Sequence, residues 1–152
     1  MIRRPALLPF LLLALAAFAP IGVIPETGGS ARLSPPEAVM AAAEAAPGSV
    51  RGVFAMRVTA TGWVRGRVYL NSENDYRDQR NLTINIAPRA AERLARRHGA
   101  RADRFFVGRQ IEVHGTARRT RIDFVSRNRP TGLYYYQTQV AVTDPDQIVV
   151  IR

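Results

Sequence analysis

Residues 63–70 read Trp-Val-Arg-Gly-Arg-Val-Tyr-Leu, and this stretch decides the fold of the chain. Its apolar and polar residues alternate with period two, which predicts one half-buried β-strand over residues 63–70. The inward face of that strand would carry Val64, Gly66, Val68 and Leu70. The outward face would carry Trp63, Arg65, Arg67 and Tyr69. Two aromatic rings alternating with two guanidiniums make a surface suited to contact with a ligand.

The first 24 residues have the features of an export signal. Arg3 and Arg4 precede an uncharged apolar run over residues 6–24, and residues 17–19 fit a small-x-small cleavage pattern. The run also approaches the roughly 20 residues that span a bilayer, and Pro20 fits poorly just after a cleavage site. We therefore expect a periplasmic or secreted protein. An inner-membrane anchor over residues 6–24, the only part expected to touch the membrane, is the alternative.

Cysteine usage and charge narrow the possible chemistry. The chain has no cysteine, which excludes disulfides, thiolate metal sites and cysteine nucleophiles. All 22 basic residues are arginine against 12 acidic residues, for a net charge of +10. A GC-rich genome would explain the absence of lysine but not the excess over acids. This excess favours anionic partners such as nucleic acid, anionic lipid or acidic polysaccharide.

Downstream of residue 24 the pattern predicts a linker over residues 25–49 and a β domain over residues 50–152. The linker holds a short helix, because Ser34 can cap it, Pro35 suits its first turn and Glu37 completes a capping box. In the domain, strands are predicted over residues 53–61, 63–70, 82–86, 111–115 with a possible extension to 124, 134–142 and, as a final extended piece, 147–151. A helix runs from Pro88 to Gly99.

Five strands with a helix between the third and fourth is the order of the five-stranded OB-fold barrel. Four segments make the resemblance more specific: Gly-Arg-Val-Tyr-Leu-Asn at residues 66–71, Leu-Thr-Ile-Asn-Ile at residues 82–86, Gly-Arg-Gln-Ile-Glu-Val-His-Gly at residues 108–115, and Asp-Pro-Asp-Gln-Ile at residues 144–148. Over residues 50–151 the chain resembles small OB-type domains of bacterial exported proteins, found alone or appended to nuclease-like proteins. The resemblance implies a binding domain without naming its ligand.

Candidate ligand-binding residues follow from the usual OB ligand surface, which is the face of strands two and three with the adjoining loops. Thr83 and Asn85 would lie beside the outward face of residues 63–70, and Tyr135 would point outward from the fifth strand. A second basic cluster near strands four and five contains Arg118, Arg119, Arg121, Arg127 and Arg129. If the turn at Pro130 folds over the same face, both clusters form one basic groove. If it does not, the second cluster is a solvated hairpin whose charges prevent edge pairing.

We expect no enzyme, cofactor or metal site. The acids at 73, 75 and 78 share a loop with two arginines, which favours a salt-bridged turn over a calcium site. His98 and His114 lack metal-ligand spacing and are interpreted as structural. The first hypothesis is binding of single-stranded nucleic acid, or another extended polyanion, without sequence specificity. The alternative is an envelope module that binds a protein partner, an anionic glycan or a lipid. The alternative role for Trp63 and Tyr69 is to cover the open end of the barrel or to pack under the linker helix, with the arginines simply solvated.

Overall fold

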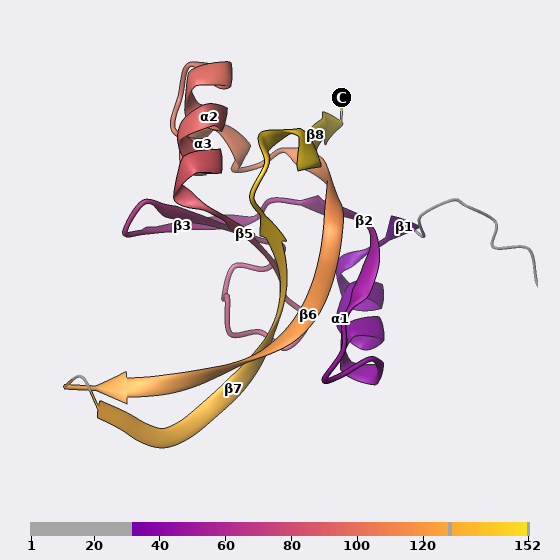
Figure 1. Cartoon of the computed structure of the whole chain (residues 1–152), viewed down its shortest axis with the longest axis vertical. Helices are drawn as coiled ribbons and strands as arrows, with labels where there is room; N and C mark the ends of the chain where they lie inside the picture. Colours follow the sequence, from indigo (N-terminus) through magenta and orange to yellow (C-terminus); the bar gives the residue numbers. More distant parts are fainter. Residues whose placement is uncertain (1–31, 128, 152) are drawn as a thin grey trace, which may run out of the picture.

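The computed structural model describes residues 32–127 and 129–151 (Figure 1). The predicted export segment therefore lies outside the described residues, as does Asn128 in the predicted turn. In chain order the elements are β1 (Arg32–Leu33), α1 (Pro35–Glu44), β2 (Val50–Arg57), β3 (Ala60–Val64), β4 (Arg67–Asn71), β5 (Leu82–Ile86), α2 (Pro88–His98), α3 (Ala102–Phe106), β6 (Gln110–Ser126), β7 (Arg129–Val142), a 3-10 turn η1 (Pro145–Gln147) and β8 (Ile148–Ile151). Within the described ranges no helix is long and apolar enough to cross a bilayer.

The strand order confirms the OB architecture. One curled sheet runs β1-β2-β6-β7-β5-β4-β3, and β8 adds to β6. The neighbouring pairs are antiparallel except β5 with β7 and the short β1 with β2, which are parallel. The helices α2 and α3 stand between β5 and β6. This is the Greek-key order of the OB-fold when β2 and β3 are counted as two halves of one bent first strand.

The bend between β2 and β3 brings the two ends of the sheet together. The backbone of Val58 still bonds to Arg109 and Gly108, next to β6, whereas the N–H of Thr59 already bonds to the carbonyl of Asn71 at the end of β4. The chain thus changes partner strand between two consecutive residues. The predicted first strand, residues 53–61, is replaced by β2 and β3, because a single straight strand cannot pair at both edges of a closing sheet.

The prediction of one strand over residues 63–70 is wrong. The chain reverses at Arg65 and Gly66, which have φ of 50° and 81°, so β3 and β4 form a tight hairpin. Positive φ at both central residues defines a type I′ turn, whose twist matches that of paired strands. Antiparallel partners share a face, and Trp63 pairs with Val68 whereas Tyr69 pairs with Gly62. The alternation is real, but it continues across a turn rather than along one strand.

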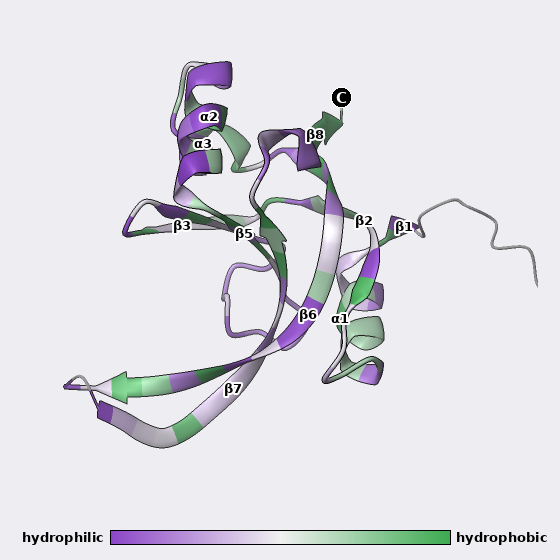
Figure 2. Ribbon diagram, viewed as in Figure 1, coloured by the Kyte–Doolittle hydropathy of each residue, from purple (hydrophilic) through white to green (hydrophobic). Residues whose placement is uncertain are grey.

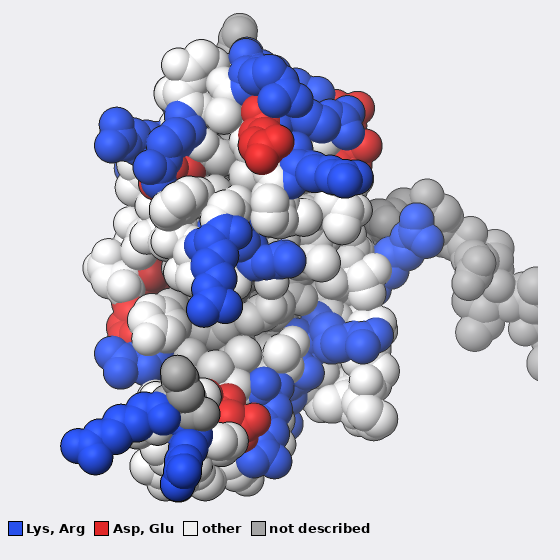
Figure 3. All heavy atoms as spheres, turned by 60° about the vertical axis from the view of Figure 1, so that its left-hand side comes forward, with Lys and Arg blue, Asp and Glu red and all other residues white. Residues whose placement is uncertain are grey.

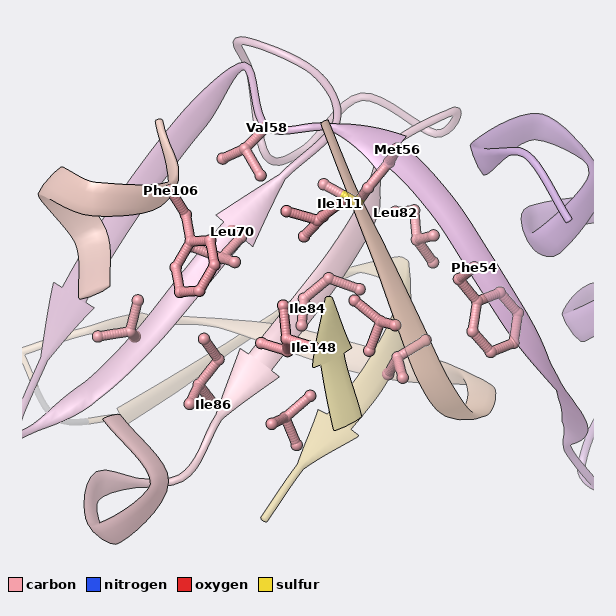
Figure 4. Packing of buried hydrophobic residues seen from close by; sticks show 14 of the residues in the cluster. Phe54, Met56, Val58, Leu70, Leu82, Ile84, Ile86, Phe106, Ile111 and Ile148 are labelled. Atoms are coloured by element: carbon pink, nitrogen blue, oxygen red, sulfur yellow. The ribbon is translucent and has the colours of Figure 1, made fainter. Parts of the chain in front are cut away.

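Two sets of helices cover the two ends of the barrel. Phe106 of α3 is fully buried and enters the core at one end, while Phe54 of β2 lies toward α1 at the other (Figure 4). Ala38 and Ala42 give α1 a small face that packs on β2 and β6. The predicted cap is present, since the Glu37 carboxylate accepts the backbone N–H of Ser34 at 2.8 Å.

The distal parts of β6 and β7 form a two-stranded ribbon that stands away from the barrel (Figure 1). β6 is 17 residues long and β7 is 14, so both exceed their predicted lengths. We call residues 118–126 and 129–137 the ribbon. Its outer part carries hydrophobic side chains that remain exposed, among them Val125 and Leu133 (Figure 2).

Candidate functional site

A trough of about 540 Å³ lies on the outer face of β3, β4, β5 and β7. The β4–β5 loop (residues 72–81) and the ribbon border it, through Asn74 and Tyr76 on one side and Ile122 and Tyr135 on the other. Its remaining lining residues are Ala60, Thr61, Gly62, Val64, Tyr69, Asn71, Thr83, Gln137 and Gln139. This is the face that ligands use on OB-folds.

The strand register arranges the polar side chains of the trough in rows. Asn71 pairs with Thr83, Thr83 with Gln139, and Gln139 with Arg118, so this row crosses four strands. The next row holds Tyr69 opposite Asn85. Because directly paired residues share a face, the row places Arg118 on the trough side of β6.

A chain of hydrogen bonds forms part of the trough floor. The Arg67 guanidinium donates to Oδ1 of Asn85 at 2.8 Å, and Nδ2 of Asn85 donates to Oε1 of Gln139 at 3.2 Å. Nε2 of Gln139 donates to Oε1 of Gln137 at 2.8 Å, and Nε2 of Gln137 donates to the carbonyl of Tyr76 at 2.9 Å. Arginine can only donate and a backbone carbonyl can only accept, so the two ends fix the orientation of every amide between them.

A second group of hydrogen bonds holds the β4–β5 loop. Asn81 is 1% exposed, and its Oδ1 accepts the backbone N–H of Glu73 at 3.1 Å. Its Nδ2 donates to Oδ1 of Asn71 at 3.1 Å and to Oγ1 of Thr83 at 2.9 Å. The loop that borders the trough is therefore tied to β4 and β5 from beneath.

Three tyrosines supply the aromatic surface of the trough. Tyr69 stands opposite Gly62, which leaves the neighbouring position free of a side chain. Tyr76 is 48% exposed, and the Arg77 guanidinium lies 5.2 Å from its ring centroid. Tyr135 packs on Phe124 at 5.2 Å between ring centroids, and burial raises the pKa of its phenol above the ordinary value.

Basic side chains dominate the charge around this side of the molecule. Figure 3 shows arginines over the helices at the top, at the centre and around the ribbon at the bottom, with few acidic groups between them. Arg67 and Arg118 are the two that the register and the hydrogen bonds connect to the trough. Both belong to the residues that the sequence predicted.

Trp63 and Arg65, two other predicted site residues, lie elsewhere. Trp63 shares the face of Val68 and points toward α2 and α3, where the Arg101 guanidinium lies 4.7 Å from its ring centroid. Arg65 occupies the hairpin turn. The physical reason is the reversal of the chain at residues 65–66, which moves Trp63 to the face opposite Tyr69.

The arginines of the second predicted basic cluster do not share one face of the ribbon. Arg119 and Arg121 pair with Thr138 and Tyr136, on the ribbon face opposite Arg118. Their guanidiniums lie 3.9 Å and 4.1 Å from the ring centroids of Tyr136 and Tyr134. Arg127 and Arg129 are at the ribbon tip. The alternative in which both clusters form one basic groove is therefore wrong, because successive strand residues alternate between faces.

Of the three consecutive tyrosines, Tyr135 faces the trough, on the outward side that the sequence predicted. Tyr134 and Tyr136 share the face of the buried Val140, and Tyr135 shares the face of Gln137 and Gln139. Tyr134 and Tyr136 are nevertheless 49% and 42% exposed, because the ribbon extends past the end of the core. The shared face is the core face of the barrel only as far as Thr138.

Two of the three acidic residues of the β4–β5 loop, Asp75 and Asp78, form ion pairs, as predicted for a salt-bridged turn. Asp75 contacts Arg77 at 3.2 Å, and Asp78 contacts Arg80 at 2.9 Å. Hydrogen bonds from the Arg80 side chain and backbone lower the pKa of Asp78 to about 2. Among the described residues no three metal-ligating side chains come together. His98 stacks on Phe105 with 3.9 Å between ring centroids, which is a packing role.

Sequence reasoning missed Asn71, Tyr76 and the two glutamines as members of the site. The predicted strand ends at Leu70, although Asn71 lies two residues after Tyr69 and so continues the same face. One further residue of strand would have included it. Tyr76 carries no such signal, because the hydrogen bonds of Asn81 place its loop.

The helix α1 leaves the trough open. It packs mainly on β2 and β6, and its Val39 and Ala43 line a separate groove with the other face of the ribbon. None of the described residues of the α1 segment lines the trough. The alternative in which the linker helix covers the binding face is therefore wrong for Tyr69.

Comparison with known proteins adds little to this geometry. No family model and no curated protein matches the chain. Among solved structures, the chain is similar to a putative aspartyl-tRNA synthetase from Leishmania major Friedlin, with 12% identity and a TM-score of 0.45 over 87% of this chain and 22% of that chain. It is likewise similar to an aspartyl tRNA synthetase from Entamoeba histolytica, with 14% identity and a TM-score of 0.45 over 95% of this chain and 28% of that chain. The chain spans less than a third of either synthetase, and the OB assignment rests on the strand order described above.

Proposed function

We propose that this domain binds single-stranded nucleic acid in the trough, without catalysis. One observation carries the proposal: the OB ligand face combines the rings of Tyr69, Tyr76 and Tyr135 with guanidiniums at Arg67 and Arg118. Single strands bind proteins through these two elements, since bases stack on aromatic side chains and phosphates contact cations. Stacking contributes about 1–3 kcal/mol per base.

The charge of the chain supports a polyanionic ligand of this kind. The net charge is +10, and most acids near the trough already have arginine partners. Arg118 has no hydrogen bond or ion pair among the described residues, so it is available for a phosphate. Arg67 keeps guanidinium nitrogens beyond the one that contacts Asn85.

Fluorescence anisotropy with a labelled 12-nucleotide single strand tests the proposal. Affinity is expected to fall with salt, with a slope in log K of about −0.7 per phosphate contacted. Arg118→Gln should reduce that slope by about 0.7. The matched control is Arg89→Gln, an exposed arginine of α2 that does not line the trough. Undetectable binding at low salt, or equal slopes for the two variants, contradicts the proposal.

A second candidate, a protein partner, is favoured by the exposed apolar side chains of the ribbon. Phe124 and Leu133 are 39% and 67% exposed, and Phe124 continues the face of Ile122 and Tyr135. A photo-crosslinking benzoylphenylalanine at position 135 distinguishes the two candidates in cells. Adducts sensitive to nuclease support nucleic acid, and adducts sensitive only to protease support a protein partner.

We also propose that the protein acts outside the cytoplasm, on the basis of residues 1–24. Mass spectrometry of the protein from an envelope fraction tests this. Loss of the residues before or near Pro20 supports a cleaved signal, and an intact mass in the membrane fraction supports the anchor.

A further inference from the structure

Asn71 differs from every other amide that lines the trough. The residue is only 6% exposed, yet it lines the trough. Oδ1 accepts two hydrogen bonds, from Nδ2 of Asn81 at 3.1 Å and from Oγ1 of Thr83 at 2.9 Å. Its Nδ2 donates no hydrogen bond to any described residue.

The orientation of this amide is fixed by the backbone. The N–H of Glu73 can only donate, so the atom of Asn81 that faces it must be the oxygen. The nitrogen of Asn81 then faces Asn71, and the atom that receives it must be the Asn71 oxygen. Nδ2 of Asn71 is left as a pure donor. It is not fully enclosed, because no fully buried side-chain nitrogen or oxygen among the described residues lacks a partner.

We infer that Asn71 is a specificity-determining residue, whose Nδ2 donates to a carbonyl on the edge of a nucleobase bound in the trough. The inference rests on the proposed function. Asn71 lies two residues from Tyr69 on one face of β4, about 7 Å along the strand. A base stacked on the Tyr69 ring can therefore direct its edge toward Asn71.

A nucleobase fits this donor better than a phosphate does. Arg67 is four residues away, about 13 Å along β4. Arg118 is three strands away in the same row, about 14 Å. A phosphate at the trough floor would lose water without gaining a close cation. The phosphates instead belong near the two arginines, on either side of the base.

A hydrogen-bond donor at Nδ2 of Asn71 would also favour some bases over others. Thymine and cytosine carry carbonyl oxygens, whereas adenine has none and places an amino donor beside its major-groove acceptor. The trough should therefore prefer oligo(dT) and oligo(dC) to oligo(dA). The expected preference is about 3- to 10-fold, which corresponds to one hydrogen bond. This differs from the prediction of binding without sequence specificity.

Two independent experiments test the inference. In the first, the wild-type protein binds a dT 12-mer and a 12-mer in which difluorotoluene replaces thymine, which keeps shape and stacking but loses the carbonyls. Affinity should fall about 3- to 10-fold. In the second, Asn71→Asp keeps an acceptor for Asn81 and Thr83 but replaces the donor by a second acceptor. The dA-to-dT ratio of Kd should fall to about one or below, because the amino group of adenine can donate to that acceptor. The control for its charge is Gln110→Glu, an exposed position outside the trough.

The possible outcomes distinguish a failure of the Asn71 inference from a failure of the proposed nucleic-acid binding. Equal affinity for dT, dA, difluorotoluene and abasic 12-mers would overturn the role of Asn71 and leave nucleic-acid binding in place. The difluorotoluene comparison decides the inference even if Asn71→Asp does not fold. Undetectable binding of all four ligands at low salt would overturn the proposed function and this inference together.

Discussion

Trp63 and Tyr69 lie on opposite faces of the same hairpin. Trp63 pairs with Val68 and faces α3, whereas Tyr69 pairs with Gly62 and faces the trough. Their separation follows from the turn at Arg65 and Gly66, which has positive φ at both residues. Two aromatic residues that look equivalent in the sequence therefore have different expected effects.

Tyr69→Ala should weaken binding of a single-stranded 12-mer by about 1–3 kcal/mol, because it removes a stacking ring. Trp63→Ala should leave the affinity within about twofold. Its cost should instead be a loss of about 0.5–1 kcal/mol in the free energy of unfolding, the contribution of an exposed contact with Arg101. Anisotropy and urea unfolding of both variants measure the two effects. A larger affinity loss for Trp63→Ala than for Tyr69→Ala would contradict this placement of the face.

Gly66→Ala should destabilise the domain by about 1–2 kcal/mol. Gly66 has φ of 81°, where a side chain is strained, and a new Cβ would lie 3.4 Å from Cβ of Pro88. Gly66→Asn is the matched control for the backbone term, because asparagine tolerates this conformation better than alanine. Urea unfolding should rank wild type above Gly66→Asn and Gly66→Ala last. Equal stability of all three would show that the turn is not of type I′.

Gly115→Ala should cost about 1–3 kcal/mol through overpacking, since a Cβ there would lie 2.7 Å from Cγ1 of Val140. The double variant with Val140→Ala removes the clash. Its loss of stability should be smaller than the sum of the two single losses by about 1 kcal/mol. Additive losses in urea unfolding would place the cost of Gly115→Ala somewhere other than Val140.

Asn81→Ala should release the β4–β5 loop and lower the free energy of unfolding by about 2–4 kcal/mol. It removes the acceptor of the Glu73 N–H and one of the two donors to Asn71 Oδ1, which keeps its bond from Thr83. An unsatisfied group costs about 1–3 kcal/mol and a lost hydrogen bond about 1 kcal/mol. Asn74→Ala, an exposed position in the same loop, is the control and should be near neutral. Limited proteolysis should cut within residues 72–80 of the first variant only. Protection of that loop in Asn81→Ala would contradict its role as the anchor.

The Asp78 carboxyl should titrate with a pKa of about 2, mainly because the Arg80 side chain and then its backbone N–H donate to it. A lowered pKa contributes stability that is present above the ordinary value of 3.8 and is lost as the pH falls through about 2. NMR titration of the side-chain carbon measures it directly. Arg80→Ala should raise the pKa only part of the way to 3.8, because the backbone donor remains. A wild-type pKa near 3.8 would contradict the ion pair.

The sequence predicted the barrel because strand alternation and the position of the helix are local signals. Residues 82–86 and the helix from Pro88 to Gly99 match β5 and α2, and Gly99 has the left-handed φ of 69° expected of a helix end. The turn at Arg65 and Gly66 was missed because a two-residue turn leaves the period-two pattern unbroken on both sides. A single glycine is then the only local signal.

About half of the predicted site could be read from alternation within strands. Arg67, Tyr69, Asn85, Arg118 and Tyr135 share the trough side because each lies on a regular strand and faces away from the core. Thr83 lines the same trough although it is 1% exposed. The amide network and the role of Asn81 depend on which strands become neighbours. Contacts such as that of Gln137 with the Tyr76 carbonyl join residues 61 positions apart, and no local pattern carries them.

The ribbon gives this domain an arm whose length is independent of its core. Past Ala117, β6 has left β2 and pairs with β7 alone, and none of the fully buried side chains among the described residues lies in the ribbon. Removing or adding two residues on each strand would preserve which side chains face the trough while changing how far the arm reaches. Natural or designed changes in ribbon length could thus alter the area that contacts a ligand. Each step of two residues per strand would add or remove one cross-strand pair on each face and leave the core packing unchanged.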